Sequence, residues 1–425
     1  MNTFGCYKKK QLDSEVCKEC NKKIDDQINE LDHGKIKIVD PIYGLVEIDD
    51  YIKIIIDTCY LQRLRRIKQL GFSYLTFPNA THTRFEHSLG VYYLIYRICE
   101  NENHAIDNKF KFILKTAAIL HDIGHGPFSH FSEELSDLVL GREHSHEKRA
   151  GNMISPEWSC LNKTLKKIMS KLGFSDKDQA DILKKIPNYI SGYSKDSLSL
   201  LINGPIDVDK MDYIVRDSYH TGVPFGLGVD LFFICDNIRF DKVKKNGHKQ
   251  IIFNEKAEAA ILNLLYAYAT SYQAIHYHHV NIIASEMILK IFNDVDISKI
   301  SDNDKTSLFW TDDCNFLNRL GMILSKKAQK KQYHEIYKMF LRINNRCLPK
   351  RKKQGITDVG KKLDFNERRA EEKKSEIITC SSLTKKVKNV DRIRVVKRDG
   401  SLRELLGYVK GIKDRFRKIV WECSF

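Results

Sequence analysis

The segment spanning residues 120–130 combines three histidines and an aspartate with residues that end a helix. The residues before it, 110–120, are mostly apolar, which predicts a helix buried over most of its surface. His121 and Asp122 would lie on its last turn, before two glycines and a proline end it. Imidazole nitrogen and carboxylate oxygen are preferred ligands of divalent cations in hydrolytic sites. Because His125 and His130 follow closely, the pattern favours a metal site over two hydrogen-bonded core residues.

Two further segments offer additional ligands. Residues 81–96 predict a helix with Arg84 and His87 one turn apart on one face. Residues 206–217 predict another helix, on which polar residues recur every four positions: Asp209, Tyr213 and Asp217. Such a stripe is usually solvated, but the apolar residues between its members indicate a packed helix whose acids need partners.

His87, the pair His121-Asp122 and Asp209 match the H…HD…D signature, so the chain resembles the HD-domain phosphohydrolases. Over residues 35–292 it is similar to one branch, that of the sterile-alpha-motif and HD-domain dNTP triphosphohydrolases and their bacterial relatives. The motifs of this branch fall at residues 40–44, 56–58, 62–65, 67–71, 84–90, 125–130 and 206–210.

The resemblance implies that His87, His121, Asp122 and Asp209 bind a divalent metal ion. Two imidazoles and two carboxylates offset the charge of one such ion and leave coordination for water and a phosphate oxygen. The ion would be Fe, Mn, Zn or Mg, because the sequence does not determine its identity.

The resemblance also implies substrate contacts and a group of catalytic histidines beside the phosphates. The substrate contacts are Arg84, Lys210, Tyr213 and Asp217, and the histidines are His125, His130 and His146. An arginine offers a planar fork to phosphate, and a lysine adds a point charge. His146 would protonate a leaving oxygen, with Glu147 or another acid orienting it. His144 competes for this role, but the family has its histidine directly before the glutamate.

For the sugar, the resemblance places Gln69 and Leu70 against the deoxyribose and Tyr213 under its 2′ edge, leaving no room for a ribose hydroxyl. From the sequence alone, Gln69 and Leu70 are the end of a helix stopped by Gly71. A candidate activator site matches guanine-reading residues: Asp57, Gln62 and Arg65. Structural salt bridges are the alternative interpretation of these three residues.

One late helix departs from the family. Tyr268 and Tyr272 stand where the branch has an arginine and a histidine, and His276-Tyr277 replaces a Tyr-Gln pair. The contacts to base and triphosphate therefore stay open, and so does the nucleoside triphosphate as substrate. Core packing on a long helix would also explain these aromatic residues.

The composition sets broader limits. A chain of 425 residues with 42% hydrophobic content can bury a large core in two or three lobes. We expect neither a membrane span nor a signal peptide, and eleven scattered cysteines predict reduced thiols in a cytoplasm, or a nucleus if the source is eukaryotic. Structural zinc on Cys6, Cys17, Cys20 and His33 is a weaker hypothesis.

The expected fold is mainly α, with a helical HD-domain core, short β hairpins and a small C-terminal α+β lobe. Residues 1–34 form a short polar segment, 35–300 the HD phosphohydrolase domain and 301–425 a basic region containing a linker. Strands are predicted at residues 35–39, 45–48, 238–240, 250–253, 390–396 and 418–422, with an Asn246-Gly247 hairpin turn, a turn at 398–400 and a helix over 402–416. Residues 346–374 are expected to form an exposed loop.

The predicted partners are a nucleotide substrate and further copies of the chain, in a dimer or tetramer. A formal charge of +16 also suits nucleic acid, and residues 346–353 concentrate part of it. The leading hypothesis is a dNTP triphosphohydrolase that releases deoxynucleoside and inorganic triphosphate. The alternatives are a phosphohydrolase or phosphodiesterase acting on another nucleotide, and a non-enzymatic protein that binds nucleotide or nucleic acid.

Overall fold

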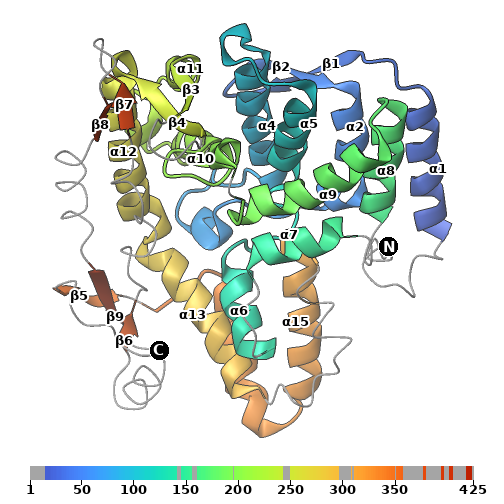
Figure 1. The fold of residues 1–425 in the computed structure, drawn as a ribbon. Coiled ribbons are helices and arrows are strands. Elements are labelled where there is room, and N and C mark those ends of the chain that lie inside the picture. The colour runs from blue at the N-terminus through green and yellow to red at the C-terminus, as the bar shows by residue number, and fades with distance from the viewer. Residues whose placement is uncertain are drawn as a thin grey trace.

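The computed structural model describes residues 15–140, 145–155, 160–194, 196–242, 249–295, 308 and 311–349, together with short strands between 351 and 423. These parts of the chain are mainly helical, with small sheets at the periphery (Figure 1). The expected fold class, a helical core with short β hairpins, is confirmed. Among the described residues, no helix has the length and apolar character needed to cross a membrane.

The main body begins with a helix and a hairpin that pack on a group of longer helices (Figure 1). Its elements are α1 (Glu15–Asn29), β1 (Lys35–Asp40), β2 (Gly44–Asp49), α2 (Asp50–Ile56), α3 (Cys59–Leu64), η2 (Gly71–Leu75), α4 (Arg84–Glu100), η3 (Glu102–His104), α5 (Asn108–Leu120), α7 (His146–Ile154), α8 (Cys160–Lys171), α9 (Asp176–Ser191), η4 (Ser197–Leu201), α10 (Val208–Thr221), η5 (Pro224–Gly226), α11 (Leu231–Asp236), η6 (Glu255–Ala257), α12 (Glu258–Ser271) and η7 (Tyr272–His276).

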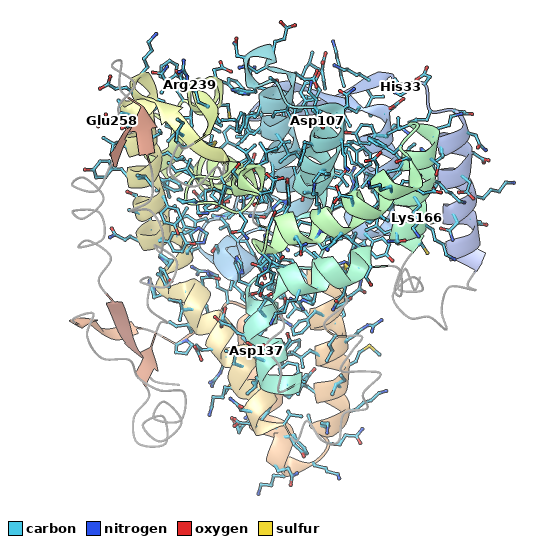
Figure 2. The ribbon with its side chains drawn as sticks, in the orientation of Figure 1. His33, Asp107, Asp137, Lys166, Arg239 and Glu258 are labelled. Carbon is cyan, nitrogen blue, oxygen red and sulfur yellow. The ribbon has the colours of Figure 1, made fainter. Side chains whose placement is uncertain are left out.

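Local signals start and stop the helices that carry the predicted site. A capping box of Thr83 and Glu86 begins α4. Asp107, labelled in Figure 2, caps α5 by accepting a hydrogen bond from the Phe110 N–H (3.0 Å). Asp207 caps α10 in the same way, and Gly222, with φ +73°, ends it. The three helices pack together around a shared apolar core.

A second lobe projects from this body (Figure 1). It contains α6 (Phe131–Leu140), α13 (His279–Asp294), α15 (Asp313–Lys327), η9 (Lys331–Tyr333) and α16 (His334–Asn344). The lobe has its own apolar core, in which Phe128 stacks on Phe72 at 4.1 Å between ring centroids and meets Phe316 edge-on at 5.9 Å. Phe128 lies within the predicted metal-site segment, residues 120–130, so this segment takes part in the second core.

Three small sheets complete the described structure. β1 and β2 pair antiparallel, as do β3 (Ile238–Lys242) and β4 (Lys249–Asn254), which confirms the predicted strands there. β7 (Arg394–Val396) lies parallel to β4 and pairs with β8 (Leu402–Glu404). β9 (Lys418–Cys423), also predicted as a strand, pairs with β5 (Arg351–Thr357) and β6 (Ile377–Thr379).

Three local predictions were wrong. β8 occupies the start of the helix expected over residues 402–416, because these residues pair with β7. β5 lies within the expected loop, because its backbone pairs with β9. Gln69 and Leu70 do not end a helix: α3 stops at Leu64, and Gly71, with φ +54°, begins η2.

Some predictions fall outside the described residues. They are the Asn246-Gly247 turn, the turn at 398–400, residues 405–416 of the expected helix, Cys6 and the side chain of Cys17. Cys20 is exposed on α1.

Candidate metal centre and its surroundings

Four predicted ligands converge where α4, α10 and the end of α5 meet. His87 Nε2 lies 2.9 Å from Asp209 Oδ1 and 3.2 Å from His121 Nε2. Asp122 Oδ1 lies 3.3 Å from His121 Nε2, and Asp122 Oδ2 lies 3.7 Å from His87 Nε2. His87 is fully buried, whereas 37% of the Asp209 side chain is exposed. The cluster therefore has the donor set of a divalent-metal site and one side open to solvent.

The histidines of this cluster are oriented from behind. His87 Nδ1 lies 2.7 Å from Asp212 Oδ2, and because a carboxylate only accepts, Nδ1 carries the hydrogen. His121 Nδ1 lies 2.8 Å from the Ala118 carbonyl and donates in the same way. Both rings thus turn Nε2 toward the centre, as metal-binding histidines do. A Cβ added at Gly90 would lie 1.8 Å from Asp212 Oδ1, so only glycine leaves room for this carboxylate.

Asp212 belongs to a buried ionic network that the sequence interpretation missed. Arg216 donates to both of its oxygens (2.9 and 3.0 Å), and the Tyr43 hydroxyl donates to Oδ1 (2.8 Å). Asp40 accepts a hydrogen bond from Arg216 at 2.9 Å. Burial alone would raise the pKa of Asp212, but Arg216 and His87 outweigh it and lower the pKa to about 2. Asp212 is therefore a permanent anion behind His87.

The acids around His87 favour its protonated form. Burial opposes the charge on His87, yet its hydrogen bonds to Asp209 and Asp212 raise its pKa to about 10. Burial likewise opposes ionisation of Asp209, but His87 lowers the pKa of this carboxyl below its usual range. His87 Nε2 must lose its proton to bind a cation, so metal binding here would release a proton. The carboxylates of Asp122 and Asp209 supply the attraction that binding of a cation needs.

A second cluster contains the three predicted catalytic histidines and one acid, Glu133. Glu133 Oε1 lies 2.7 Å from His146 Nδ1, 3.3 Å from His130 Nδ1 and 3.6 Å from His125 Nδ1. Asp122 Oδ1, which faces the metal centre, also lies 3.3 Å from His125 Nε2. The second cluster is therefore contiguous with the first.

The second cluster shows which acid contacts His146 more closely. Of the expected alternatives, Glu147 approaches Nε2 only to 3.5 Å, whereas another acid, Glu133, lies 2.7 Å from Nδ1. Burial opposes protonation of His146, but Glu133 outweighs it and raises the pKa of the imidazole. Burial, Arg84 and His146 together lower the pKa of His125 far below its usual value. These shifts favour the protonated form of His146 and the neutral form of His125, and the two rings stack 3.9 Å apart. The competing His144 lies outside the described residues.

The two predicted phosphate contacts, Arg84 and Lys210, already hold internal partners. Arg84 Nη1 donates to Asp122 Oδ2 (2.7 Å), and its Nε donates to the Ser129 hydroxyl (2.8 Å). Lys210 Nζ donates to the Gly204 carbonyl (2.9 Å) and pairs with Asp207. Both cations lie beside the metal centre, but a phosphate would share them with carboxylates.

The predicted sugar contacts border an aromatic wall. Tyr213 lies on α10, with its ring 6.4 Å from His87 and 6.1 Å from His276. α12 ends in a π-helical turn, η7, which carries Tyr272 and His276; such turns recur at functional sites. The rings of Tyr272 and His276 lie 4.6 Å apart, and Tyr268 lies 4.9 Å from Tyr272.

Asp217 lies behind this wall between two histidines. His82 Nε2 lies 2.8 Å from Asp217 Oδ1, and His276 Nε2 lies 3.6 Å from Oδ2. His82 and Asp217 are fully buried. Asp217 Oδ2 and Gln69 Oε1 are buried acceptors without a hydrogen bond in the protein. Leu70 packs nearby against Ala80 and Ile275. Unsatisfied buried acceptors of this kind suit a ligand that brings its own donors.

The candidate activator residues contact other parts of the same chain. Asp57 Oδ2 accepts from Gln27 Nε2 (2.7 Å) and pairs with Lys23, both on α1. Gln62 donates to the Ile56 carbonyl (2.9 Å), and Arg65 donates to Gln62 (2.9 Å). These contacts fit the alternative interpretation, in which the three residues stabilise the fold.

Comparison with known proteins defines the class. The HD-domain model matches residues 84–187, a range that includes His87, His121 and Asp122. The chain therefore contains an HD domain, and the expected resemblance to the HD-domain phosphohydrolase superfamily is confirmed.

Some of the similar proteins are named as enzymes, and others are uncharacterized. The chain is 34% identical to the uncharacterized protein YwfO of Bacillus subtilis, over 60% of this chain and 54% of that protein. It is 30% identical to the deoxynucleoside triphosphate triphosphohydrolase SAMHD1 homolog of Dictyostelium discoideum, over 76% and 62%. A hypothetical protein from Aquifex aeolicus has a similar structure, with TM-score 0.67 and 27% identity over 92% and 96%. The chain spans about half the length of the curated relatives that it matches.

Proposed function

We propose that this protein is a metal-dependent phosphohydrolase that cleaves deoxynucleoside triphosphates to deoxynucleoside and inorganic triphosphate. The observation that carries the proposal is the convergence of His87, His121, Asp122 and Asp209, open to solvent at Asp209. The chain's similarity to proteins named as triphosphohydrolases supports the choice of reaction.

The protein's own groups divide the work between phosphate and leaving group. When bound, a divalent cation supplies Lewis acidity and lowers the pKa of water. Arg84 would turn part of its fork from Asp122 toward a phosphate oxygen. His146, protonated through Glu133, would donate the proton on Nε2 to the leaving oxygen. His130, more than half exposed, would contact the phosphates from solvent.

The sugar pocket supports a substrate that carries a hydroxyl group. Gln69 Oε1 and Asp217 Oδ2 would each accept from a sugar hydroxyl, which would satisfy acceptors that lack donors in the protein. The ring of Tyr213 would pack against the 2′ edge, so that a ribose hydroxyl would force it to move.

A second candidate is a phosphohydrolase or phosphodiesterase acting on another nucleotide. It is favoured by the pairing of Arg84 and Lys210 with carboxylates and by Tyr268 and Tyr272 in place of basic residues. A substrate with fewer phosphates would need fewer cations. A homo-oligomer, a nucleic-acid partner and the cellular compartment stay predictions from the sequence.

The two candidates differ in their products. Metal-loaded protein would be incubated with dNTPs, NTPs and cyclic nucleotides, and the products identified by mass. One-step appearance of inorganic triphosphate supports the leading proposal, whereas stepwise phosphate release or cleavage of a cyclic nucleotide supports the second. His121→Ala and Asp122→Ala should remove both bound metal and turnover from a folded protein. Full activity in either variant would contradict the ligand set.

A further inference from the structure

The start of α15 touches the metal-site segment from outside the residues that match the HD-domain model. Residues 311–313 follow α13 in the described chain and lead into α15. All three are buried, although two are aspartates. Buried acids need strong partners. The partners of Asp313 are the backbone N–H groups of Lys68, which forms a β-bridge with Thr83 beside Arg84, and of Phe128, two residues before His130.

Arg63 joins residues 311–313 to the loop after Asp122. Its guanidinium, on a side chain that is almost fully buried, donates to three backbone carbonyls. These acceptors are Thr311 O (3.2 Å), Ile123 O (2.7 Å) and His125 O (2.6 Å). A rigid fork with several donors fixes the relative positions of the backbones that it binds. The loop carrying His125 is thus tied to the second lobe.

Asp313 holds the next part of the same loop. Its Oδ1 accepts from the Phe128 N–H (2.7 Å), and its Oδ2 accepts from the Lys68 N–H (3.0 Å). Phe128 and Ser129 have φ values of +57° and +62°, in the left-handed region that ordinary side chains disfavour. Two consecutive residues in this region persist only when their surroundings hold them there. The hydrogen bond from the Phe128 N–H to Asp313 is one interaction that stabilises this turn.

The held turn positions Arg84. The Ser129 hydroxyl donates to the Lys68 carbonyl (2.7 Å) and accepts from Arg84 Nε (2.8 Å). Arg84 in turn donates to Asp122, one of the four candidate metal ligands. Asp313 therefore accepts hydrogen bonds from the backbone at both Lys68 and Phe128. The hydroxyl of Ser129, the residue after Phe128, joins the same two backbone segments by its hydrogen bond to the Lys68 carbonyl. His130, which directly follows Ser129, shares the same anchor.

We propose that Asp313 is a positioning residue, which holds the strained turn at Phe128 and Ser129 so that Arg84 and His130 face the phosphates. The inference rests on the proposed function, because that function assigns the phosphate roles to Arg84 and His130. It adds a residue of the second lobe, far beyond the end of the HD-domain match, to the control of the reaction.

The test compares Asp313→Asn with Asp312→Asn in the full-length, metal-loaded protein. In the wild type, both carboxylate oxygens of Asp313 accept hydrogen bonds from backbone N–H groups. Asn at 313 keeps one acceptor but turns its NH2 group toward one of these N–H groups. Asn at 312 preserves the helix cap, since asparagine caps well, and loses mainly the ion pair between the buried Asp312 and the half-exposed Arg66. Asp313→Asn therefore weakens the hydrogen bonds that hold the turn at Phe128 and Ser129, whereas Asp312→Asn leaves these hydrogen bonds in place.

We expect Asp313→Asn to lower kcat by about tenfold to 100-fold, the loss expected for a small misplacement of catalytic groups. Bound metal and KM should stay close to the wild-type values. Amide hydrogen exchange in residues 123–131 should become faster. Asp312→Asn should leave kcat and this exchange near wild type. Ser129→Ala should reproduce the loss of kcat, and the double variant Asp313→Asn/Ser129→Ala should lose no more than either single one.

Unchanged kcat and unchanged exchange in Asp313→Asn would overturn the inference, as would fully additive effects in the double variant. If Asp313→Asn does not fold, Ser129→Ala decides: it must lower kcat with metal still bound. If the wild-type protein hydrolyses no nucleotide, the proposed function fails. Hydrogen exchange then still tests the hold on residues 123–131, because it needs no substrate.

Discussion

Replacing Asp212 by asparagine should weaken metal binding although Asp212 is not a ligand. Asp212 accepts from His87 Nδ1 on one side and from Arg216 on the other. An asparagine must turn its NH2 group toward one of these partners. Arg216 donates to both oxygens, so in either orientation the NH2 group meets one N–H group of Arg216. In the place of Oδ2 it also faces His87, whose Nδ1 can become an acceptor, and we expect it there. His87 Nδ1 would then accept, and its hydrogen would move to Nε2, which must be free to bind metal.

The size of this effect follows from the place of Asp212 behind a metal-binding histidine. Partners in that position contribute about 10- to 100-fold in affinity, or ~1.4–2.8 kcal/mol. Asp212→Asn also removes one of two acids around the buried Arg216, which should lower the free energy of unfolding by about 3 kcal/mol. Asp40 still pairs with Arg216, so we expect a folded protein.

Titration with Mn²⁺, following free Mn²⁺ by its EPR signal well below the melting temperature, would measure the affinity. Tyr43→Phe is the matched control, because it removes one hydrogen bond to Asp212 and leaves the interaction with His87. It should cost about 1 kcal/mol of stability and little Mn²⁺ affinity. If Asp212→Asn bound Mn²⁺ as tightly as the wild type, the tautomer argument would be refuted.

The other predictions concern the cap of α10, the pH profile and the sugar. Asp207→Ala should lower the free energy of unfolding by about 0.5–2 kcal/mol, measured by thermal unfolding, because Asp207 caps α10 and pairs with Lys210. Its position near the ligand Asp209 alone would predict only a minor effect on this free energy. Asp207→Asn, which can still cap, should lose less. Activity should fall as pH rises through the raised pKa of His146, and Glu133→Gln should move this fall to lower pH; an unmoved profile would exclude the proton role. The His146–Glu133 pair likewise stabilises the fold below the ordinary histidine pKa and loses this contribution as pH rises through the folded value. dNTP turnover should exceed NTP turnover by about tenfold, and Tyr213→Ala should reduce the ratio; equal hydrolysis of dGTP and GTP by the wild type would remove the deoxynucleotide assignment.

Local patterns predicted the elements that carry the site. The apolar run before His121 gives α5, and the four-residue spacing from Asp209 gives α10. Glu133 could also have been found from the sequence, since it follows the predicted His130 by three residues. Asp212 was not, because its hydrogen bond with His87 joins residues 125 positions apart. No local signal reports such a pairing.

Tertiary pairing also explains the strands that were missed. Residues 402–404 have good helix formers, yet they form β8 because β7 offers an antiparallel partner. The basic residues of β5 lack the alternation of a half-buried strand, and pairing with β9 places them in a sheet. In both cases the partner strand lies outside any window that periodicity can sample.

The pairing of β7 with β4 has a consequence for shortened versions of the chain. Phe253 and Asn254 of β4 hydrogen-bond alongside Val395 and Val396, so the far C-terminal region completes a sheet that begins much earlier in the sequence. A chain ending near Pro349 would keep the metal centre but leave that side of β4 without a neighbour. Unpaired strand edges recruit strands from other molecules. Such a fragment should therefore self-associate through β4, and its assembly state would say nothing about that of the intact protein.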